Sequence, residues 1–410
     1  PQRYSTDEEY EEAFLELFSR AVGDRLRVPK MSVGSMLSGG MDSGSIVAVA
    51  QGILKTQGHG PLPTFSLARP RGGDCPESLG IYATLDFLEL KGTQIRADDP
   101  GSLTDDIGKN LDEPFDGIFL FMRAILGAAK RQGLKVVLDG AAGDIVFNEG
   151  AYIPRLLRRG LLRRAWRETV GEEAFWGGSS PLPCFTRYLA NAYLPEFVKR
   201  PSRGPRQRRK ERRYVEESLI SPELARRVDI AERFERMRST FSGLLSSDAG
   251  LERVRKIRPN YTAGRERYGR IAASAGVEGR DPFTDQRVVE FCAHLPDHQC
   301  ARDGWPKFLL RRAMAGRLPD TVRWGRRKPH IGFVFGENFA RLEASRGRLT
   351  LDGLQATLAA YVDSGRLRAS WVVFESGGGT ERKLRAIEQV FRAYVLSLWL
   401  ANSVTRPVVK

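Results

Sequence analysis

The chain has 410 residues, of which 41% are hydrophobic, and a formal net charge of +15. A chain of this length and composition forms a globular protein with a sizeable core and favours two domains. It has no run of about 18 consecutive apolar residues for a membrane span, no secretory signal and no C-x-x-C pair among its four cysteines, so we expect a cytoplasmic protein without disulfides or zinc.

The predicted elements alternate between helices and strands in the first third of the chain. A helix over residues 7–26 comes first, because its apolar residues recur at helical spacing. Strands separated by helices then predict an α/β fold with a doubly wound parallel sheet, in which ligands bind at the carboxyl ends of strands. The rest of the chain is expected to be mostly helical. The strands are predicted at residues 33–37, 62–68, 92–97 and 135–140, and the helices between them at 43–55, 76–89 and 118–132.

The positive charge is concentrated in residues 155–167 and 199–213. RLLRRGLLRRAWR, the first stretch, has leucines near helical spacing and predicts an amphipathic basic helix. KRPSRGPRQRRKERR, the second, combines like charges with proline and glycine and predicts an exposed loop or linker. These stretches are either solvated faces of an inserted subdomain or a docking surface for an anionic substrate. No nucleic-acid-binding module accompanies the arginines, so nucleic acid is not an expected partner.

MLSGGMDSGSIVAVA, residues 36–50, joins the first predicted strand to the helix that follows it. Ser38, Gly39 and Gly40 allow successive amide N–H groups to face one concavity, and the helix start adds the positive end of its dipole, so this turn suits phosphate oxygens. A Walker-type loop needs a lysine after the glycines. Asp42 stands there instead and can hold a cation. The same residues also suit a plain strand-to-helix turn that binds nothing.

The motif S-G-G-x-D-S resembles the pyrophosphate-binding loop of the ATP-pyrophosphatase group. VVLDGAAGDIVF, residues 136–147, is similar to the second signature of asparagine synthetase-type domains. Residues 276–296 resemble that family's helix-and-turn segment, in which Asp281, Phe283 and Asp285 are expected to organise a turn. Residues 305–333 resemble its C-terminal lysine-bearing segment. The blocks follow one another in the family's order, and the resemblance implies an adenine nucleotide alpha hydrolase-like core.

The resemblance also implies ATP and Mg²⁺ as cofactors and a carboxylate that is adenylated before an amine attacks it. Asp42 and Asp144 match the family's two metal-holding aspartates, and Lys328 matches the lysine that stabilises developing negative charge. Asp144 and Lys328 are therefore the expected catalytic residues. The plain alternatives are loop-capping aspartates and a solvated basic face around Lys328. The expected nucleotide contacts are Leu37, Ser38, Gly39, Gly40, Asp42, Ser43, Ser66 and Gly140.

Two positions depart from the family pattern, because Ala141 and Ile145 stand where asparagine synthetases usually carry acids. Alanine can neither bind ammonia nor accept a proton from an amine, which disfavours ordinary aspartate amidation. The family's glutamine-hydrolysing domain is not among these residues, which start at Pro1, and we expect it to be trimmed or degenerate upstream. Macrolactam closure of a lasso precursor peptide is the leading hypothesis. A glutamine-hydrolysing asparagine synthetase, a polysaccharide amidating enzyme and a non-catalytic ATP-binding scaffold are the alternatives.

We expect three segments along the chain. Residues 1–150 are the nucleotide-binding core, 151–254 a basic and mainly helical insertion, and 255–410 the helical remainder that carries the lysine segment. The expected partners are a carboxylate substrate, on a peptide or another acidic macromolecule, and leader-binding or protease proteins.

Overall fold

The computed structural model describes residues 4–29, 32–96, 112–114, 116–178, 180–194, 208–241, 253, 259–326, 331–376 and 381–404. The chain forms two compact units, each built from several segments. The first unit comprises residues 1–95, 125–194 and 243–329, and the second comprises residues 96–124, 195–242 and 330–410. The three sequential segments expected from the sequence stay a prediction.

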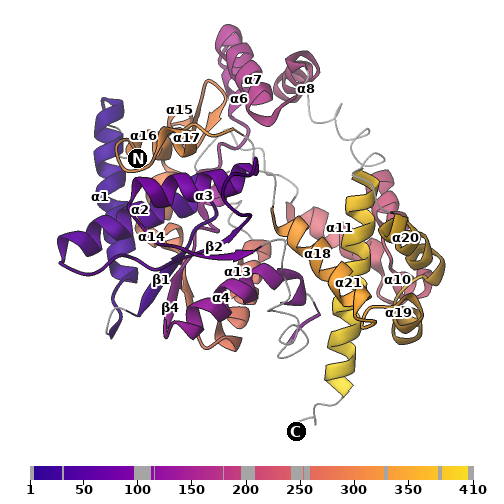
Figure 1. Cartoon of the computed structure of the whole chain (residues 1–410). Helices are drawn as coiled ribbons and strands as arrows, with labels where there is room; N and C mark the ends of the chain where they lie inside the picture. Colours follow the sequence, from indigo (N-terminus) through magenta and orange to yellow (C-terminus); the bar gives the residue numbers. More distant parts are fainter. Residues whose placement is uncertain are drawn as a thin grey trace. The chain divides into compact units, whose positions relative to one another are not determined.

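The first unit is built around a five-stranded sheet of order β3-β2-β1-β4-β5. Figure 1 labels three of its strands, β1, β2 and β4. Strand β1 pairs in parallel with both β2 and β4, and β4 pairs in parallel with β5. The predicted α/β fold is therefore confirmed. Because the chain leaves β1 toward one edge and later reaches β4 on the other side, the carboxyl ends of β1 and β4 flank the point where strand order reverses. The strands are β1 (Val33–Met36), β2 (Thr64–Ala68), β3 (Thr93–Arg96), β4 (Val136–Leu138) and β5 (Glu278–Arg280).

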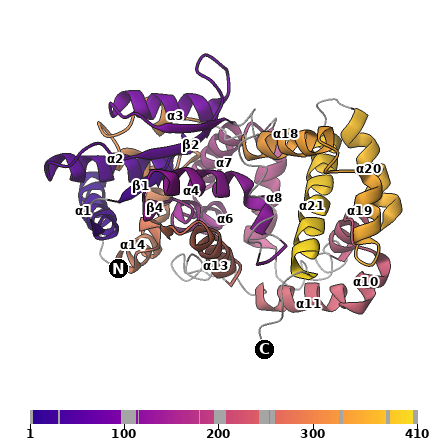
Figure 2. The same cartoon turned by 60° about the horizontal axis from the view of Figure 1, so that its bottom comes forward.

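Helices cover both faces of this sheet. α2 (Met41–Thr56) and α3 (Pro76–Phe87) follow β1 and β2, whereas α4 (Leu120–Arg131) and α13 (Pro259–Ser274) precede β4 and β5. Right-handed crossovers that run in opposite directions along a sheet put their helices on opposite faces. Figures 1 and 2 show α2 and α3 on one face and α4 and α13 on the other. The helices and strands predicted up to β4 all form.

An aromatic cluster joins the first helix, α1 (Asp7–Arg25), to the segments that leave β4 and β5. The rings of Phe14 and Phe18 stack with centroids 5.3 Å apart. Phe147, beyond β4, meets Phe14 edge-on at 5.4 Å, and Phe283, beyond β5, lies 4.8 Å from Phe18. All four rings are fully or almost fully buried. Because buried aromatic pairs fix orientation as well as contributing burial, the cluster holds the carboxyl ends of β4 and β5 in place.

The basic stretch at residues 155–167 forms two helices, so the prediction of one helix was wrong. α6 (Tyr152–Arg158) ends just before Gly160, and α7 (Leu162–Trp176) begins just after it. Gly160 has a φ of +74°, a left-handed conformation that ends a helix at little cost only for glycine. The break buries the leucines of α6 and exposes Leu161 and Leu162. α8 (Pro181–Tyr193) completes this helical group.

Short elements complete the first unit. Its cysteines, Cys75, Cys184, Cys292 and Cys300, are all free. The elements are α5 (Gly143–Val146), η4 (Pro282–Thr284), α14 (Gln286–Ala293), α15 (Asp297–Cys300), β6 (Ala301–Arg302), β7 (Trp305–Pro306), α16 (Phe308–Ala313) and α17 (Asp320–Arg323).

The second unit is helical. Its longest helix, α21 (Glu381–Val404), packs against α18, α19 and α20. Among the described residues no helix is long and apolar enough to cross a membrane. The other elements are η3 (Asp116–Phe119), α10 (Pro222–Arg227), α11 (Ile230–Phe241), α18 (Ile331–Ser345), α19 (Leu351–Leu358) and α20 (Ser364–Ser376).

Residues 208–213 are helical, in contrast to the loop predicted over 199–213. Arg212 pairs with Glu216 at 3.0 Å and Arg213 pairs with Glu217, both one helical turn away. Such i,i+4 pairs offset the repulsion between the clustered arginines and favour a helix. Residues 199–207 lie outside the described part of the chain.

Candidate functional site

The loop after β1 leads straight into α2 at the carboxyl edge of the sheet. The Ser38 amide donates a hydrogen bond to the Ser43 hydroxyl at 3.0 Å, and the hydroxyl oxygens of the two serines also lie 3.0 Å apart. Gly40 is the N-cap of α2 and offers no side-chain acceptor. The first N–H groups of a 16-residue helix therefore need another acceptor, which an anion can supply.

Gly39 is required by both its conformation and its surroundings. Its φ is +73°, and a Cβ atom added there would lie 2.2 Å from the Glu77 carbonyl oxygen and 2.7 Å from the Ile81 amide nitrogen. Gly80 has the reciprocal restriction, since its Cβ would lie 2.3 Å from the Gly39 carbonyl oxygen. The loop therefore sits directly on the backbone of α3, and any side chain at Gly39 would displace it.

The second glycine-rich turn, after β4, interlocks with the first. A Cβ atom on Gly143 would lie 2.4 Å from the Asp42 Cγ, and one on Gly140 would lie 3.1 Å from the Asp42 Cβ and from the Ser43 amide nitrogen. The two glycines thus leave the space that the Asp42 side chain fills. This close contact brings Asp144 of the second turn to the same place as Asp42 of the first.

A buried lysine connects the two aspartates. The Lys307 ammonium lies 2.7 and 2.5 Å from the two Asp42 carboxylate oxygens and 2.5 Å from an Asp144 carboxylate oxygen. Lys307 is only 6% exposed, whereas the Asp144 side chain is 76% exposed. Burial on its own lowers the pKa of Lys307, but Asp42 and Asp144 together outweigh it and raise that pKa, so the ammonium stays charged at neutral pH.

Cationic and aromatic side chains build the wall beside Lys307. The Arg311 guanidinium lies 5.1 Å from the centre of the Trp305 ring, and that of Arg326 lies 4.9 Å from the same ring. Arg311 also donates a hydrogen bond to the Pro306 carbonyl oxygen at 2.7 Å. Burial lowers the pKa of Arg311 to about 10, which leaves it cationic near neutrality. This wall is positive and suited to anionic groups.

Asp281, at the end of β5, supports the second turn. Its carboxylate accepts hydrogen bonds from the Phe283 amide at 2.9 Å and from the Ala142 amide at 2.7 Å. The expected turn-organising role is confirmed, and the contact with Ala142 adds a second role. Burial, and then the neighbouring Asp139, raise the pKa of Asp281 to about 8. Asp281 is therefore a positioning residue for the turn that carries Asp144.

The structure does not test the predicted roles of Leu37, Ser66 and Lys328. Leu37 and Ser66 are both buried, and the Ser66 hydroxyl has no hydrogen-bond partner in the described part of the chain. Their contact with a nucleotide stays a prediction. Lys328 lies outside the described residues. The prediction overlooked Lys307, which belongs to the same resembling segment and directly precedes an apolar and basic helix.

The donor set fits Mg²⁺ rather than a transition metal. Among the described residues no group of three or more His, Cys, Asp or Glu side chains could hold a metal ion. Asp42 and Asp144, however, already share one cation, the Lys307 ammonium. Mg²⁺ is commonly held by one or two carboxylates together with substrate phosphates and water, so these two carboxylates suit it when a nucleotide supplies the other oxygens.

The chain matches the asparagine synthase family over residues 13–401. It is also 24% identical over 324 residues to a protein of Bacillus subtilis (strain 168) named asparagine synthetase 3, glutamine-hydrolyzing. That match covers 77% of this chain and 47% of the relative. The chain therefore spans about half the length of this relative. Both glycine-rich turns and Lys307 lie inside the matched residues.

Proposed function

Because the chain belongs to the asparagine synthase family, we propose that it is an ATP-dependent ligase that forms amide bonds through an acyl-adenylate. A substrate carboxylate oxygen attacks the α-phosphorus of ATP, and the bond to the bridging oxygen breaks to release pyrophosphate. An amine nitrogen then attacks the acyl carbon, AMP leaves, and the amine loses a proton. The observation that carries the proposal is the convergence of Asp42, Asp144 and Lys307 beside an open helix N-terminus.

Each element of the site has a place in this reaction. The N–H groups at the start of α2 and the Ser38–Ser43 pair offer hydrogen bonds to the pyrophosphate part of ATP. Asp42 and Asp144 would hold Mg²⁺, which when bound neutralises charge on the phosphates. Lys307 supplies a fixed positive charge where negative charge develops, the kind of preorganised interaction that contributes most to catalysis.

Macrolactam closure of a lasso precursor peptide is the substrate that we favour. Ala141 is exposed and Ile145 half-buried on the second turn, so neither provides the carboxylate that ammonia chemistry would use. A peptide substrate supplies both its carboxylate and its amine, and needs no ammonia. Leader-binding and protease proteins are the partners that such a substrate implies. The four free cysteines fit a reducing compartment such as the cytoplasm.

A glutamine-hydrolysing asparagine synthetase is the second candidate, because the relative from Bacillus subtilis carries that name. The two candidates differ in the carboxylate that they activate. A non-catalytic ATP-binding scaffold differs from both, because it releases no pyrophosphate with any carboxylate.

ATP–pyrophosphate exchange tests the proposal. We expect exchange with a peptide that carries a free N-terminal amine and an acidic side chain, and none with free aspartate. Asp42→Asn and Asp144→Asn should each reduce exchange by about a hundredfold or more, whereas Asp352→Asn, at an exposed position of α19, should not. Exchange with aspartate alone would favour the second candidate. If no carboxylate supported exchange, the scaffold would be favoured.

A further inference from the structure

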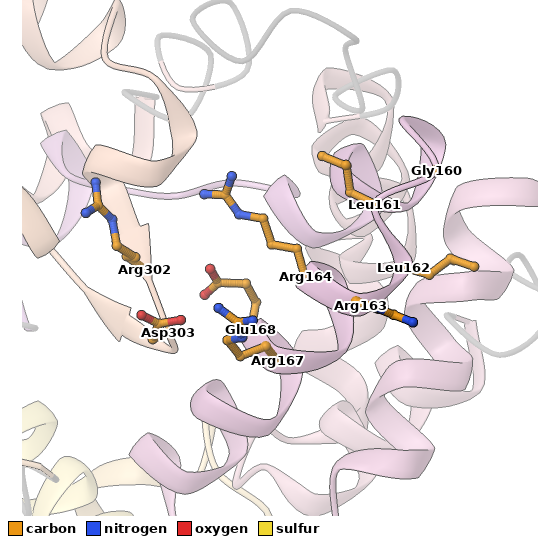
Figure 3. Close-up of a pocket in the computed structure, with 9 residues that line it drawn as sticks. All are labelled: Gly160, Leu161, Leu162, Arg163, Arg164, Arg167, Glu168, Arg302 and Asp303. Atoms are coloured by element: carbon orange, nitrogen blue, oxygen red, sulfur yellow. The ribbon is translucent and has the colours of Figure 1, made fainter. Parts of the chain in front are cut away.

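A cavity outside the candidate ATP site lies between the start of α7 and the turn that joins β6 to β7. Its volume is about 750 Å³. Figure 3 shows Arg164 and Glu168 extending from α7 toward the side on which Arg302 and Asp303 lie. None of the residues around this cavity belongs to the site of Asp42 and Asp144. The lining residues are Gly160, Leu161, Leu162, Arg163, Arg164, Arg167, Glu168, Arg302 and Asp303.

The walls of the cavity are held firmly together. A Cβ atom on Gly171 of α7 would lie 2.3 Å from the Asp303 carbonyl oxygen, so the helix and the turn are in backbone contact. The buried carboxylate of Glu168 accepts hydrogen bonds from the Gly304 amide at 3.0 Å and from the Tyr152 hydroxyl at 2.7 Å. α7 is therefore fixed to both α6 and the turn, and it presents its side chains from a rigid support.

Arginines line much of the cavity, and three of them have no carboxylate partner among the described residues. Within the described part of the chain, Arg163, Arg164 and Arg167 form no ion pair with a carboxylate, and all three are exposed. Arg302, in contrast, is held by Asp7 at 2.8 and 2.9 Å. Burial, followed by Arg302 and Arg164, lowers the pKa of His298, which indicates a positive field in this region. These three guanidinium groups belong to exposed residues that line the cavity.

The same group of helices, α6 to α8, also carries exposed large apolar side chains. Leu161, Leu162 and Trp166 are 43%, 50% and 39% exposed, and all three lie within the first turns of α7 or directly before it. Exposed apolar surface that is concentrated in one place marks a site of interaction. Most of the exposed large apolar side chains of the described residues belong to this group: Leu161, Leu162, Trp166, Val170, Trp176, Leu182, Tyr193 and Leu194.

We propose that the cavity and the exposed face of α7 bind an acidic polypeptide segment that also carries apolar side chains. The exposed Arg163, Arg164 and Arg167 match its carboxylates, because charge-assisted hydrogen bonds to a guanidinium are strong and directional. Leu162 and Trp166 match its apolar side chains. Asp303 and Glu168 line the same cavity and disfavour a densely anionic nucleic acid. A concave site fits a chain segment better than it fits a flat membrane surface.

Fluorescence anisotropy with a labelled short peptide that alternates glutamate with leucine tests this proposal. The protein is used without ATP, so this result is independent of whether exchange occurs. We expect the probe to bind, and the double variant Arg164→Glu, Arg167→Glu to weaken binding by about tenfold or more. The matched control, Arg226→Glu with Arg227→Glu, makes the same change of charge at exposed positions of α10 and should leave binding unchanged.

A second pair of variants tests the apolar part. Leu162→Ser should weaken binding, whereas Leu384→Ser, at a position that is 51% exposed on α21, should not. Failure of the native protein to bind the probe would overturn the proposal, as would equal weakening by the two double variants. Binding of single-stranded DNA or of anionic vesicles in place of the peptide, lost in the variant of Arg164 and Arg167, would assign the surface to those partners instead.

Discussion

The Lys307 ammonium lies 2.7 and 2.5 Å from the two carboxylate oxygens of Asp42. Both side chains are at least nine-tenths buried, so each supplies the charge that makes burial of the other tolerable. A metal ion held by Asp42 would compete with this ammonium for the same oxygens. Lys307 is thus the natural counter-ion of the aspartates and a positive charge next to the place where phosphates are expected.

Lys307→Met tests the role of this charge. The methionine side chain is similar in length to that of lysine but has no ammonium group. We therefore expect ATP–pyrophosphate exchange to fall by about a hundredfold to a thousandfold, the usual effect of removing one preorganised group that stabilises charge. Mg²⁺ should raise the thermal midpoint of the variant more than that of the native protein, because the two carboxylates no longer have their counter-ion.

Lys55→Met is the matched control for that experiment, because Lys55 is exposed near the end of α2. In this control, the rate of exchange and the rise in thermal midpoint on addition of Mg²⁺ should both equal those of the native protein. An unchanged rate of exchange in Lys307→Met would show that Lys307 takes no part in the reaction.

Gly143→Ala tests the close contact between the two glycine-rich turns. The added methyl group would lie 2.4 Å from the Asp42 Cγ, which forces Asp42 or the turn to move. We expect exchange to be largely lost while circular dichroism shows a folded protein. Gly52→Ala makes the same change in α2, where nothing lies within 4 Å of the added atom. There alanine should stabilise the helix by about 0.5–1 kcal/mol. Equal loss of exchange in the two variants would contradict the interlocking of the turns.

Local pattern predicted strands β1 to β4 of the sheet but missed β5, and it failed where two local signals competed. From β1 to β4, apolar periodicity and glycine punctuation predict the same elements, and the structure confirms each of them, with ends that differ by at most two residues. At residues 155–167 the leucine spacing favoured one helix, but the left-handed conformation of Gly160 divides it. At residues 208–213 the like charges favoured a loop, whereas the ion pairs one turn away stabilise a helix. Neither outcome follows from spacing alone.

The candidate site was partly predictable for a similar reason. Asp42 and Asp144 each follow a glycine-rich turn after a strand, and neighbouring parallel strands bring such turns to one edge. Lys307 is separated from Asp42 by 265 positions, and its left-handed φ of +56° leaves no mark in the pattern of residue types. Its place depends on how β7 and α16 pack, which requires the three-dimensional structure.

Asp297 supports a buried charge cluster whose loss should be costly. One of its carboxylate oxygens lies 2.7 Å from the guanidinium of Arg155 and 2.8 Å from that of Arg253, and these arginine side chains are 6% and 2% exposed. Asp297→Asn removes the negative charge that both buried guanidinium groups contact, so we expect a loss of about 3–5 kcal/mol in stability, measured as a lower thermal midpoint. Asp86→Asn, which breaks the exposed pair with Arg71, should change the midpoint little. If both substitutions lowered the thermal midpoint equally, burial would not be the reason that the loss of Asp297 is costly.

Asp7 should make the protein's stability depend on pH. Hydrogen bonds from Arg302 hold the pKa of Asp7 well below its ordinary value, which is about 3.9 in an unfolded chain. A carboxyl group whose pKa is lowered by folding stabilises the protein above that value, and this contribution is lost as the pH falls below it. Asp7→Asn should therefore lower the thermal midpoint at neutral pH, by an amount equivalent to about 1 kcal/mol because solvent screens this partly exposed pair. The difference from the native protein should shrink below about pH 4.

Asp352→Asn, at an exposed position in the first turn of α19, is the matched control and should show no such difference. A deficit in Asp7→Asn that stays constant down to acid pH would mean that packing, and not the ion pair with Arg302, accounts for the contribution of Asp7.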